Sequence, residues 1–431
     1  MPARLDIGDD GFEAAFARIL GAKREVTAEV GDAVAEIIAQ VRADGDDALC
    51  ALTSRFDRFE LTKEALAIGQ DEVEAAVRDC PEDQLEALRL AASRIEAYHA
   101  RQLPEDARWT DEAGVTLGWR WTPIDAAGLY VPGGTASYPS SVLMNAIPAR
   151  VAGVERLVMV VPTPDRALNP LVLAAAKLAG VTEIYRVGGA QAIAALAFGT
   201  QTIAPVDKIV GPGNAFVAAA KRQVFGHVGI DSIAGPSEIA VIADGGNDPA
   251  WIAADLLSQS EHDPSSQSVL FTTDAAFADA VEREAEAQIE ASPRGRIARA
   301  AWEANGAVVT VRTLGEAAAL SNRLAPEHLE LAVEDPDALL AQIRHAGAVF
   351  LGRHAPEAIG DYVAGPDHVL PTARAARYAS GLSVLDFVKR TTVTGLTADA
   401  IRAIGPAAAT LADAEGLPSH AQSVRLRLEQ G

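Results

Sequence analysis

Residues 183–198 read EIYRVGGAQAIAALAF, and residues 208–224 read KIVGPGNAFVAAAKRQV. Each stretch opens with a short run rich in β-branched or aromatic residues, passes through a glycine turn, and continues as an alanine-rich segment typical of a helix. Repeated strand–turn–helix units predict βαβ connections, which place their strands in a parallel sheet. These two stretches therefore predict an α/β fold with parallel sheets.

The same alternation extends outward on both sides of these stretches. Further strands are expected at residues 156–161, 269–273, 306–311 and 348–351, and further helices at residues 170–178 and 249–260. Residues 1–105 predict mostly helices, and residues 115–119 predict a strand. The tail from about residue 382 is short and predicted to be mostly helical. It is too small to form a large core alone, so it should pack on something else.

Composition excludes several classes of function. The 431 residues are 49% hydrophobic and 22% charged, as in a globular protein of two or more domains. A net charge of −22 argues against nucleic acid, whose phosphates need a basic face. No apolar run approaches the ~20 residues that span a bilayer, and the first residues show no secretory signal. Two cysteines, Cys50 and Cys80, suit a reducing compartment, so a cytoplasmic location is expected.

Three glycine-containing loops are candidates for a nucleotide site. The turns at 187–191 and 210–214 each precede a helix, whose N-terminal N–H groups suit phosphate. Neither is a complete dinucleotide fingerprint, so a plain βα connection and a nucleotide contact remain equal alternatives. In the loop at 130–137, Tyr130 could stack on a flat ring, or the loop could be a simple turn. No Walker lysine pattern is present, which argues against ATP chemistry.

A metal site is suggested by the end of the expected helix 249–260. Gln259 and His262 lie three residues apart and share a face, although on this segment alone a solvated polar helix end is the better explanation. Two further candidate ligands strengthen the metal interpretation. They are Asp361, which follows a helix start marked by proline, and His420, which lies beside a helix break. Imidazole, carboxylate and amide oxygen together suit zinc with an open position.

Glu327 and His328 follow Pro326, which must end the preceding helix. Histidine is a natural general base near neutral pH, and a glutamate can activate water. The plain alternative is the start of a strand with two solvated polar groups.

Ordered blocks along the whole chain resemble the histidinol dehydrogenase family. The matching blocks are GLYVPGG (128–134), VGGAQAI (187–193), VGPGN (210–214), AGPSE (234–238), QSEHD (259–263), APEHL (325–329), GPDHVLPT (365–372), SGLSV (380–384) and EGLPSH (415–420). The chain shows no departure at the positions that the family uses for chemistry.

The resemblance implies a role for each candidate residue of the site. It places the zinc ligands, one ion per subunit, at Gln259, His262, Asp361 and His420, and the acid/base pair at Glu327 and His328. It places the substrate contacts at Ser237, Gln259, His262, His328, Asp361, His368, Glu415 and His420. It places the NAD contacts at Tyr130, Gln191 and Asn214.

The activity implied is the four-electron oxidation of L-histidinol to L-histidine through the aldehyde, with reduction of two NAD. His328 would take the hydroxyl proton, Glu327 would activate water on the aldehyde, and zinc would orient the substrate.

The family's architecture is also implied. It consists of two Rossmann-like parallel-sheet domains in an intertwined homodimer, whose tails complete the active sites of the partner subunits. The expected divisions are a helical segment at 1–24, a main domain with the metal site at 25–129 and 237–381, a nucleotide-contacting domain at 130–236, and a helical tail at 382–431.

Three alternatives remain open. A sibling zinc- and NAD-dependent dehydrogenase, similar to the sulfopropanediol oxidisers, would favour basic residues where this chain has Glu415. A zinc hydrolase would use Glu327 to activate water without nicotinamide. A non-catalytic metal or nucleotide sensor would have little reason to keep the Glu327–His328 pair.

Overall fold

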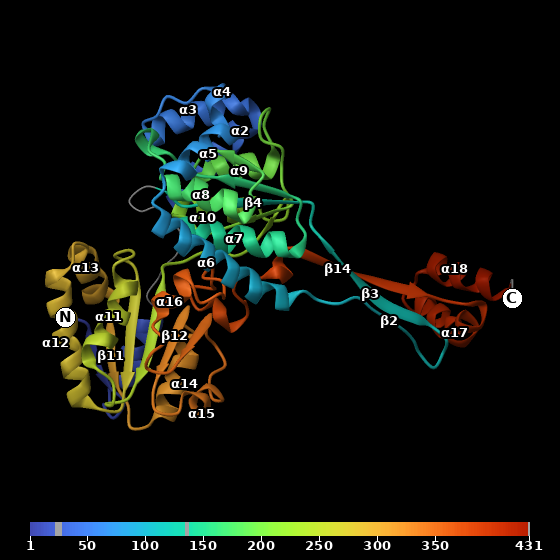
Figure 1. Ribbon diagram of the computed structural model, residues 1–431. Helices are drawn as coiled ribbons and strands as arrows, with labels where there is room; N and C mark the ends of the chain where they lie inside the picture. Colours follow the sequence, from blue (N-terminus) through green and yellow to red (C-terminus); the bar gives the residue numbers. More distant parts are fainter. Residues whose placement is uncertain (22–27, 134–137, 430–431) are drawn as a thin grey trace.

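The computed structural model describes residues 1–21, 28–133 and 138–429, and these residues form an α/β protein with three sheets (Figure 1). Two of the sheets are parallel, as the alternation of strands and helices predicted, so that fold class is confirmed. The third is a small antiparallel sheet that the sequence analysis did not predict. Among the described residues, no helix combines the length and the apolar character needed to cross a membrane.

The five-stranded parallel sheet has the order β6-β5-β4-β7-β8. Its strands are β4 (Ala126–Tyr130), β5 (Arg156–Val160), β6 (Glu183–Tyr185), β7 (Lys208–Val210) and β8 (Gly229–Ile230). One face packs on α2 (Ala28–Asp44), α3 (Asp46–Asp57), α9 (Gly189–Phe198) and α10 (Ala215–Val224). The other packs on α5 (Gln70–Asp79), α6 (Glu82–His99), α7 (Pro139–Ala152) and α8 (Pro170–Ala179). The chain order reverses between β4 and β7, where such sheets form a crevice at the carboxyl ends of the strands.

The six-stranded parallel sheet has the order β1-β11-β10-β9-β12-β13. Its strands are β1 (Ala3–Asp6), β9 (Glu238–Ala243), β10 (Gln267–Thr272), β11 (Ala307–Thr310), β12 (His328–Ala332) and β13 (Ala348–Leu351). One face packs on α1 (Phe12–Leu20), α14 (Leu314–Leu324) and α15 (Pro336–Leu340). The other packs on α11 (Pro249–Ser260), α12 (Ala275–Ala291) and α13 (Gly295–Asn305). Since both faces are covered, the central strands β9, β10 and β12 are buried along their whole length rather than at alternate residues.

An arm leaves these two layered bodies (Figure 1). It contains the antiparallel sheet of β2 (Ala107–Thr110), β3 (Thr116–Pro123) and β14 (Val388–Gly395), in the order β14-β3-β2. At its end α17 (Ala398–Ala414) and α18 (Pro418–Glu429) pack on each other. These two helices form the tip of the arm, remote from both parallel sheets.

The remaining short elements connect these layers. They are α4 (Lys63–Leu66), α16 (Glu357–Tyr362) and the 3₁₀ turns Ala100–Gln102, Pro164–Arg166, Ala375–Arg377 and Val384–Asp386.

The strands and helices of the βα units were predicted to within a few residues, and the helix at 249–260 has the predicted bounds. Two strands lie within the segments that were predicted to be mostly helical. Residues 3–6 form β1, in which only Leu5 is buried, and residues 388–395 of the tail form β14. Of the predicted loop 130–137, residues 134–137 lie outside the described residues.

Candidate active site and metal centre

The C-terminal end of α11 presents the first two candidate metal ligands. Asp248 caps the start of this helix by accepting from Ala250 N at 2.9 Å, and the helix ends at Ser260, so Gln259 occupies its last turn. Gln259 Nε2 lies 3.3 Å from His262 Nδ1. The Gln259 side-chain oxygen is buried and has no hydrogen-bond partner among the described residues. The partial negative charge of a helix C-terminus also favours a cation at this place.

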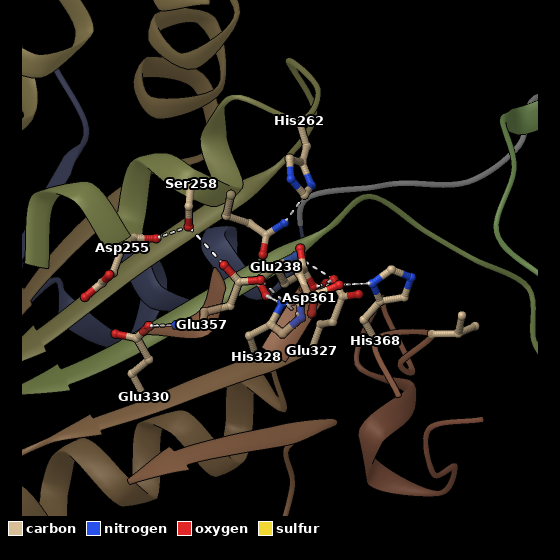
Figure 2. Close-up of polar contacts among 12 residues, drawn as sticks. Glu238, Asp255, Ser258, His262, Glu327, His328, Glu330, Glu357, Asp361 and His368 are labelled. Carbon is tan, nitrogen blue, oxygen red and sulfur yellow. Dashed lines mark hydrogen bonds and ion pairs between the residues drawn. The ribbon is translucent and has the colours of Figure 1, made fainter. Parts of the chain in front are cut away.

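Helix α16 adds two carboxylates to the same centre (Figure 2). Glu357 and Asp361 lie four residues apart on one face of this helix, and their carboxyl groups contact each other. Glu357 Oε2 accepts from Ser258 Oγ at 3.0 Å, which ties α16 to α11. Ligand atoms of His328, Glu357 and Asp361 lie within 4.8 Å of one another.

The electrostatics of this centre favour a divalent cation. Burial raises the pKa of Asp361 well above its usual value, and the adjacent Glu357 carboxyl raises it further. Burial also raises the pKa of Glu357, whereas its hydrogen bond from Ser258 and the nearby His262 oppose that shift. A bound cation would reverse these shifts by pairing with the crowded carboxylates. The uncommitted amide oxygen, the imidazole and the carboxylates therefore fit zinc as a donor set.

A second pair of carboxyl groups lies behind Glu357. The backbone N–H of Glu357 donates to Glu330 Oε1 at 2.6 Å. Glu330 in turn shares a hydrogen bond with Asp255 of α11. Burial raises the pKa of Asp255 to about 6 and that of Glu330 well above its usual value. The hydrogen bond between Glu330 and Asp255 thus supports Glu357 from the side away from the metal centre (Figure 2).

One residue, Glu238, holds both members of the candidate acid/base pair through its backbone. Its N–H donates to Glu327 Oε2 at 3.0 Å, and its carbonyl lies 3.1 Å from His328 Nδ1. This is possible because β9 and β12 are neighbours and both begin here. The carbonyl can only accept, so Nδ1 carries the proton and Nε2 is left as the acceptor.

The chain enters β12 through a constrained turn. Helix α14 ends at Leu324, Ala325 adopts a left-handed conformation with φ of 50°, and Pro326 prevents any further helix. The turn delivers Glu327 and His328 to the buried amino end of the strand.

Burial sets the protonation states of this pair. It lowers the pKa of His328 to about 4, opposed by the bond to Glu238, while the charge of His262 lowers it further. It raises the pKa of Glu327 well above its usual value, and the neighbouring carboxylates add to that shift. His328 is therefore neutral at pH 7 and able to accept a proton, and Nε2 lies 3.6 Å from Glu357 Oε1.

Two further predicted substrate contacts flank this centre. His368 Nδ1 lies 3.0 Å from the Asp361 carbonyl, and Nε2 lies 3.2 Å from Ser141 Oγ of α7. Burial lowers the pKa of His368 to about 4. Ser237 is half-buried directly before β9, next to Glu238. The His368–Ser141 contact joins the two parallel-sheet bodies at the site.

The structure does not bring Glu415 and His420 to this centre. Both are exposed at the junction between α17 and α18, on the tip of the arm (Figure 1). A centre made by one subunit therefore lacks these two predicted contacts.

The three predicted NAD contacts lie on the elements that follow strands of the five-stranded sheet. Tyr130 is buried at the end of β4, and its hydroxyl accepts from Gly189 N at 3.1 Å. Burial raises its pKa to about 12, and its enclosed ring offers no open face for stacking. Gln191 is buried in the first turn of α9. Asn214 is exposed and caps α10 by accepting from Phe216 N and Val217 N.

Two residues of the site were not predicted from the sequence. Glu357 was given no role, although its spacing of four from Asp361 places the two on one helix face. The backbone of Glu238 carries no signal in the sequence, because its role depends on the pairing of β9 with β12.

Comparisons with known proteins match the whole chain. The family model described as histidinol dehydrogenase matches residues 21–428. A histidinol dehydrogenase of Ruegeria pomeroyi is 63% identical over 430 residues, covering 100% of this chain and 99% of the relative. One of Cereibacter sphaeroides is 64% identical with the same coverage. The crystal structure of histidinol dehydrogenase from Elizabethkingia anophelis superposes with a TM-score of 0.94 at 36% identity, covering 100% of this chain and 98% of that one.

Proposed function

Since this chain belongs to the histidinol dehydrogenase family of NAD-dependent oxidoreductases in histidine biosynthesis, we propose that the centre around His328 oxidises L-histidinol to L-histidine. The reaction removes four electrons in two steps, through the aldehyde, and reduces two NAD. The observation that carries the assignment is the neutral, buried His328, whose Nε2 faces the carboxylates of α16.

The family uses zinc, and the donor set described above fits it. We propose that Gln259, His262 and Asp361 of one subunit hold the ion together with His420 of the partner subunit. When bound, zinc supplies a fixed positive charge that orients the amino alcohol. Ser237, His368 and the partner subunit's Glu415 complete the contacts to the substrate.

The chain's own groups would move the protons. His328 Nε2 takes the hydroxyl proton in each oxidation, while Nδ1 stays bonded to the Glu238 carbonyl and keeps the ring in place. NAD accepts the hydride in both steps. Glu327 acts between them: Oε2 is held by Glu238 N, and the other oxygen draws a proton from the water that adds to the aldehyde.

The location of Glu415 and His420 supports a homodimer with shared sites. Both residues lie at the tip of the arm, so a second subunit must present its arm to the first. Exposed apolar side chains on the arm, such as Leu411, Leu417 and Leu426, would gain cover from such a partner. The division into residues 1–24, 25–129 with 237–381, 130–236 and 382–431, and the cytoplasmic location, stay predictions.

Mixed dimers test the proposal directly. His328→Ala removes the proposed base from one part of the site, and His420→Ala removes the ligand that the arm would supply. Each variant alone should lose ~100–10,000-fold in turnover, measured as NADH formed with histidinol. Refolded together in equal amounts, they should recover about a quarter of wild-type activity, since half of the dimers are mixed and each mixed dimer holds one complete site.

Mixing either variant with itself is the control. An absence of recovery in folded mixed dimers would show that each arm serves its own subunit. Full activity of His328→Ala alone would remove His328 as the base.

A further inference from the structure

A buried ion pair lies at the carboxyl end of β7, outside the residues discussed so far. Lys221 of α10 bonds to Asp231, which directly follows β8. Their side chains are only 3% and 4% exposed. Burying two charges costs free energy, and an apolar pair would often stabilise the fold equally well. Stability alone therefore does not explain an ion pair at this place.

The pair holds both polar backbone groups of a single residue, Gly211. Gly211 N donates to Asp231 Oδ2 at 2.7 Å, and Lys221 Nζ donates to the Gly211 carbonyl at 3.0 Å. Gly211 has a φ of +108°, and a Cβ there would lie 2.2 Å from the Tyr130 carbonyl. The residue is thus fixed from both sides in a conformation and a close approach that only glycine allows.

We call Lys221 and Asp231, which together hold Gly211, the clamp. The clamp lies at the point where the strand order of the five-stranded sheet reverses. Gly211 directly follows β7, and Tyr130 ends the neighbouring strand β4. Nucleotides bind parallel sheets in this crevice. The turn that begins at Gly211 ends at Asn214, which caps α10. A shift of Gly211 would therefore move the start of α10 together with Asn214.

Asp231 also begins the segment that joins the two parallel-sheet bodies. Besides Gly211, it accepts from Ser232 N at 2.6 Å. Six residues further along, the chain reaches Ser237 and then Glu238, whose backbone holds Glu327 and His328. The clamp thus ties the turn after β7 to the same segment that delivers the acid/base pair.

We propose that Lys221 and Asp231 are positioning residues for the dinucleotide, which fix the turn 211–214 in the conformation that NAD requires. This inference rests on the proposed NAD-dependent function and on the NAD contact that the family resemblance implies for Asn214. The pair is neutral as a whole and both partners are buried, so it acts through Gly211 and not by attracting the cofactor's phosphates.

The test uses the zinc-loaded full-length protein and two variants. Lys221→Met removes one charge, and Lys221→Met/Asp231→Asn removes both, so that no unpaired buried charge remains to prevent folding. Direct titration with NADH, followed by fluorescence, should show at least about tenfold weaker binding in both variants, as expected when a binding group is displaced. The KM for NAD should rise with it, whereas the KM for histidinol and the bound zinc should stay unchanged.

A matched pair at the other end of the same strand provides the control. Lys208, the first residue of β7, bonds to Asp386 Oδ1 at 2.8 Å with side chains 16% and 27% exposed. Lys208→Met should lower thermal stability without changing NADH affinity. A purely structural role for Lys221 would instead raise both KM values together, or leave both unchanged in the folded double variant, and either result overturns the proposal.

Asn214→Ala separates this inference from the proposed contact. Weaker NADH binding in the double variant but not in Asn214→Ala would refute the Asn214 contact and keep the clamp. Weaker binding in Asn214→Ala alone would keep the contact and refute the clamp.

Discussion

At the scale of single residues, burial acts in opposite directions on the two kinds of ionisable group in the site. It lowers the pKa of His328 and His368 to about 4, so both imidazoles are neutral at pH 7. It raises the pKa of Glu327 and Asp361 well above their usual values. The site therefore combines uncharged bases with carboxyl groups that a cation would return to their charged form.

His328 should make the free energy of unfolding depend on pH. Its pKa is about 4 in the folded protein and near 6.5 in the unfolded chain, so the unfolded state binds the proton first as the pH falls. The stability due to this residue is complete above pH 6.5 and is lost between pH 6.5 and 4, with roughly 2 kcal/mol gone at pH 5. Urea unfolding of zinc-free protein at pH 7.5 and 5 should show that loss. His328→Asn should lose roughly 2 kcal/mol less than the wild type, because only the contribution of His368, whose pKa is also about 4, remains.

His345→Asn is the matched control, because His345 is partly exposed and lies outside the site. It should keep the full pH dependence of the wild type. Equal losses in wild type and His328→Asn would contradict the shifted pKa of His328.

The sequence identified the polar residues of the site only in part. Gln259, His262 and Asp361 were expected together from the resemblance, and electrostatic contact between His262 and Glu357 places the end of α11 at α16. Glu357 was passed over, because an acid four residues from another is common on exposed helices, and only tertiary packing buries this one.

At the scale of elements, α11 separates its stability from its chemistry. Asp248 caps its N-terminus, while Gln259 lies in the last turn at the other end. Nothing at the cap contacts the metal centre among the described residues. The two ends can therefore be changed independently.

Asp248→Ala should destabilise the protein by about 1 kcal/mol, since it leaves a helix N–H without its acceptor. Zinc affinity, measured by competition with a chelator, should remain that of the wild type. Asp274→Ala, which uncaps α12 by removing the acceptor of Ala276 N and Phe277 N, is the control and should have the same size of effect. A variant as stable as the wild type would contradict the capping role.

Elements with a strong local period were predictable, and those defined by distant partners were not. Apolar runs and glycine turns mark the βα units in the sequence, and the strands and helices of these units were predicted. Strand β1 buries one residue and pairs with β11, three hundred positions away in the sequence. For β14 a signal did exist, in the β-branched run Thr391–Thr394, but the surrounding helices dominated the prediction of the tail.

At the scale of the whole molecule, the arm extends to one side of the two layered bodies (Figure 1). Its helices α17 and α18 pack on each other and leave apolar side chains exposed. The arm carries Glu415 and His420, whereas the bodies carry the remaining predicted site residues. The arrangement follows from the path of β3 and β14, and no residue spacing in the sequence could have predicted it.

A chain that ends at Gly395 should test the arm as a unit. Both parallel sheets should remain folded by circular dichroism, because α17 and α18 contribute little to their cores. The truncated protein should run as a monomer in size-exclusion chromatography, bind zinc at least about tenfold more weakly, and lose turnover. The full-length His420→Ala variant, which removes one ligand but keeps the arm, should remain dimeric. An active, dimeric truncated protein would refute the shared site.

The pairing of β1 with β11 has a consequence for synthesis on the ribosome. Residues 3–6 are made before their partner at 307–310, which emerges later by on the order of 15–60 s at ordinary rates of translation. The five-stranded sheet can close in the meantime, since its strands span residues 126–230. Until then Phe12 and Phe16 of α1 lack the apolar partners that cover them in the folded protein, so the nascent chain exposes surface that favours aggregation.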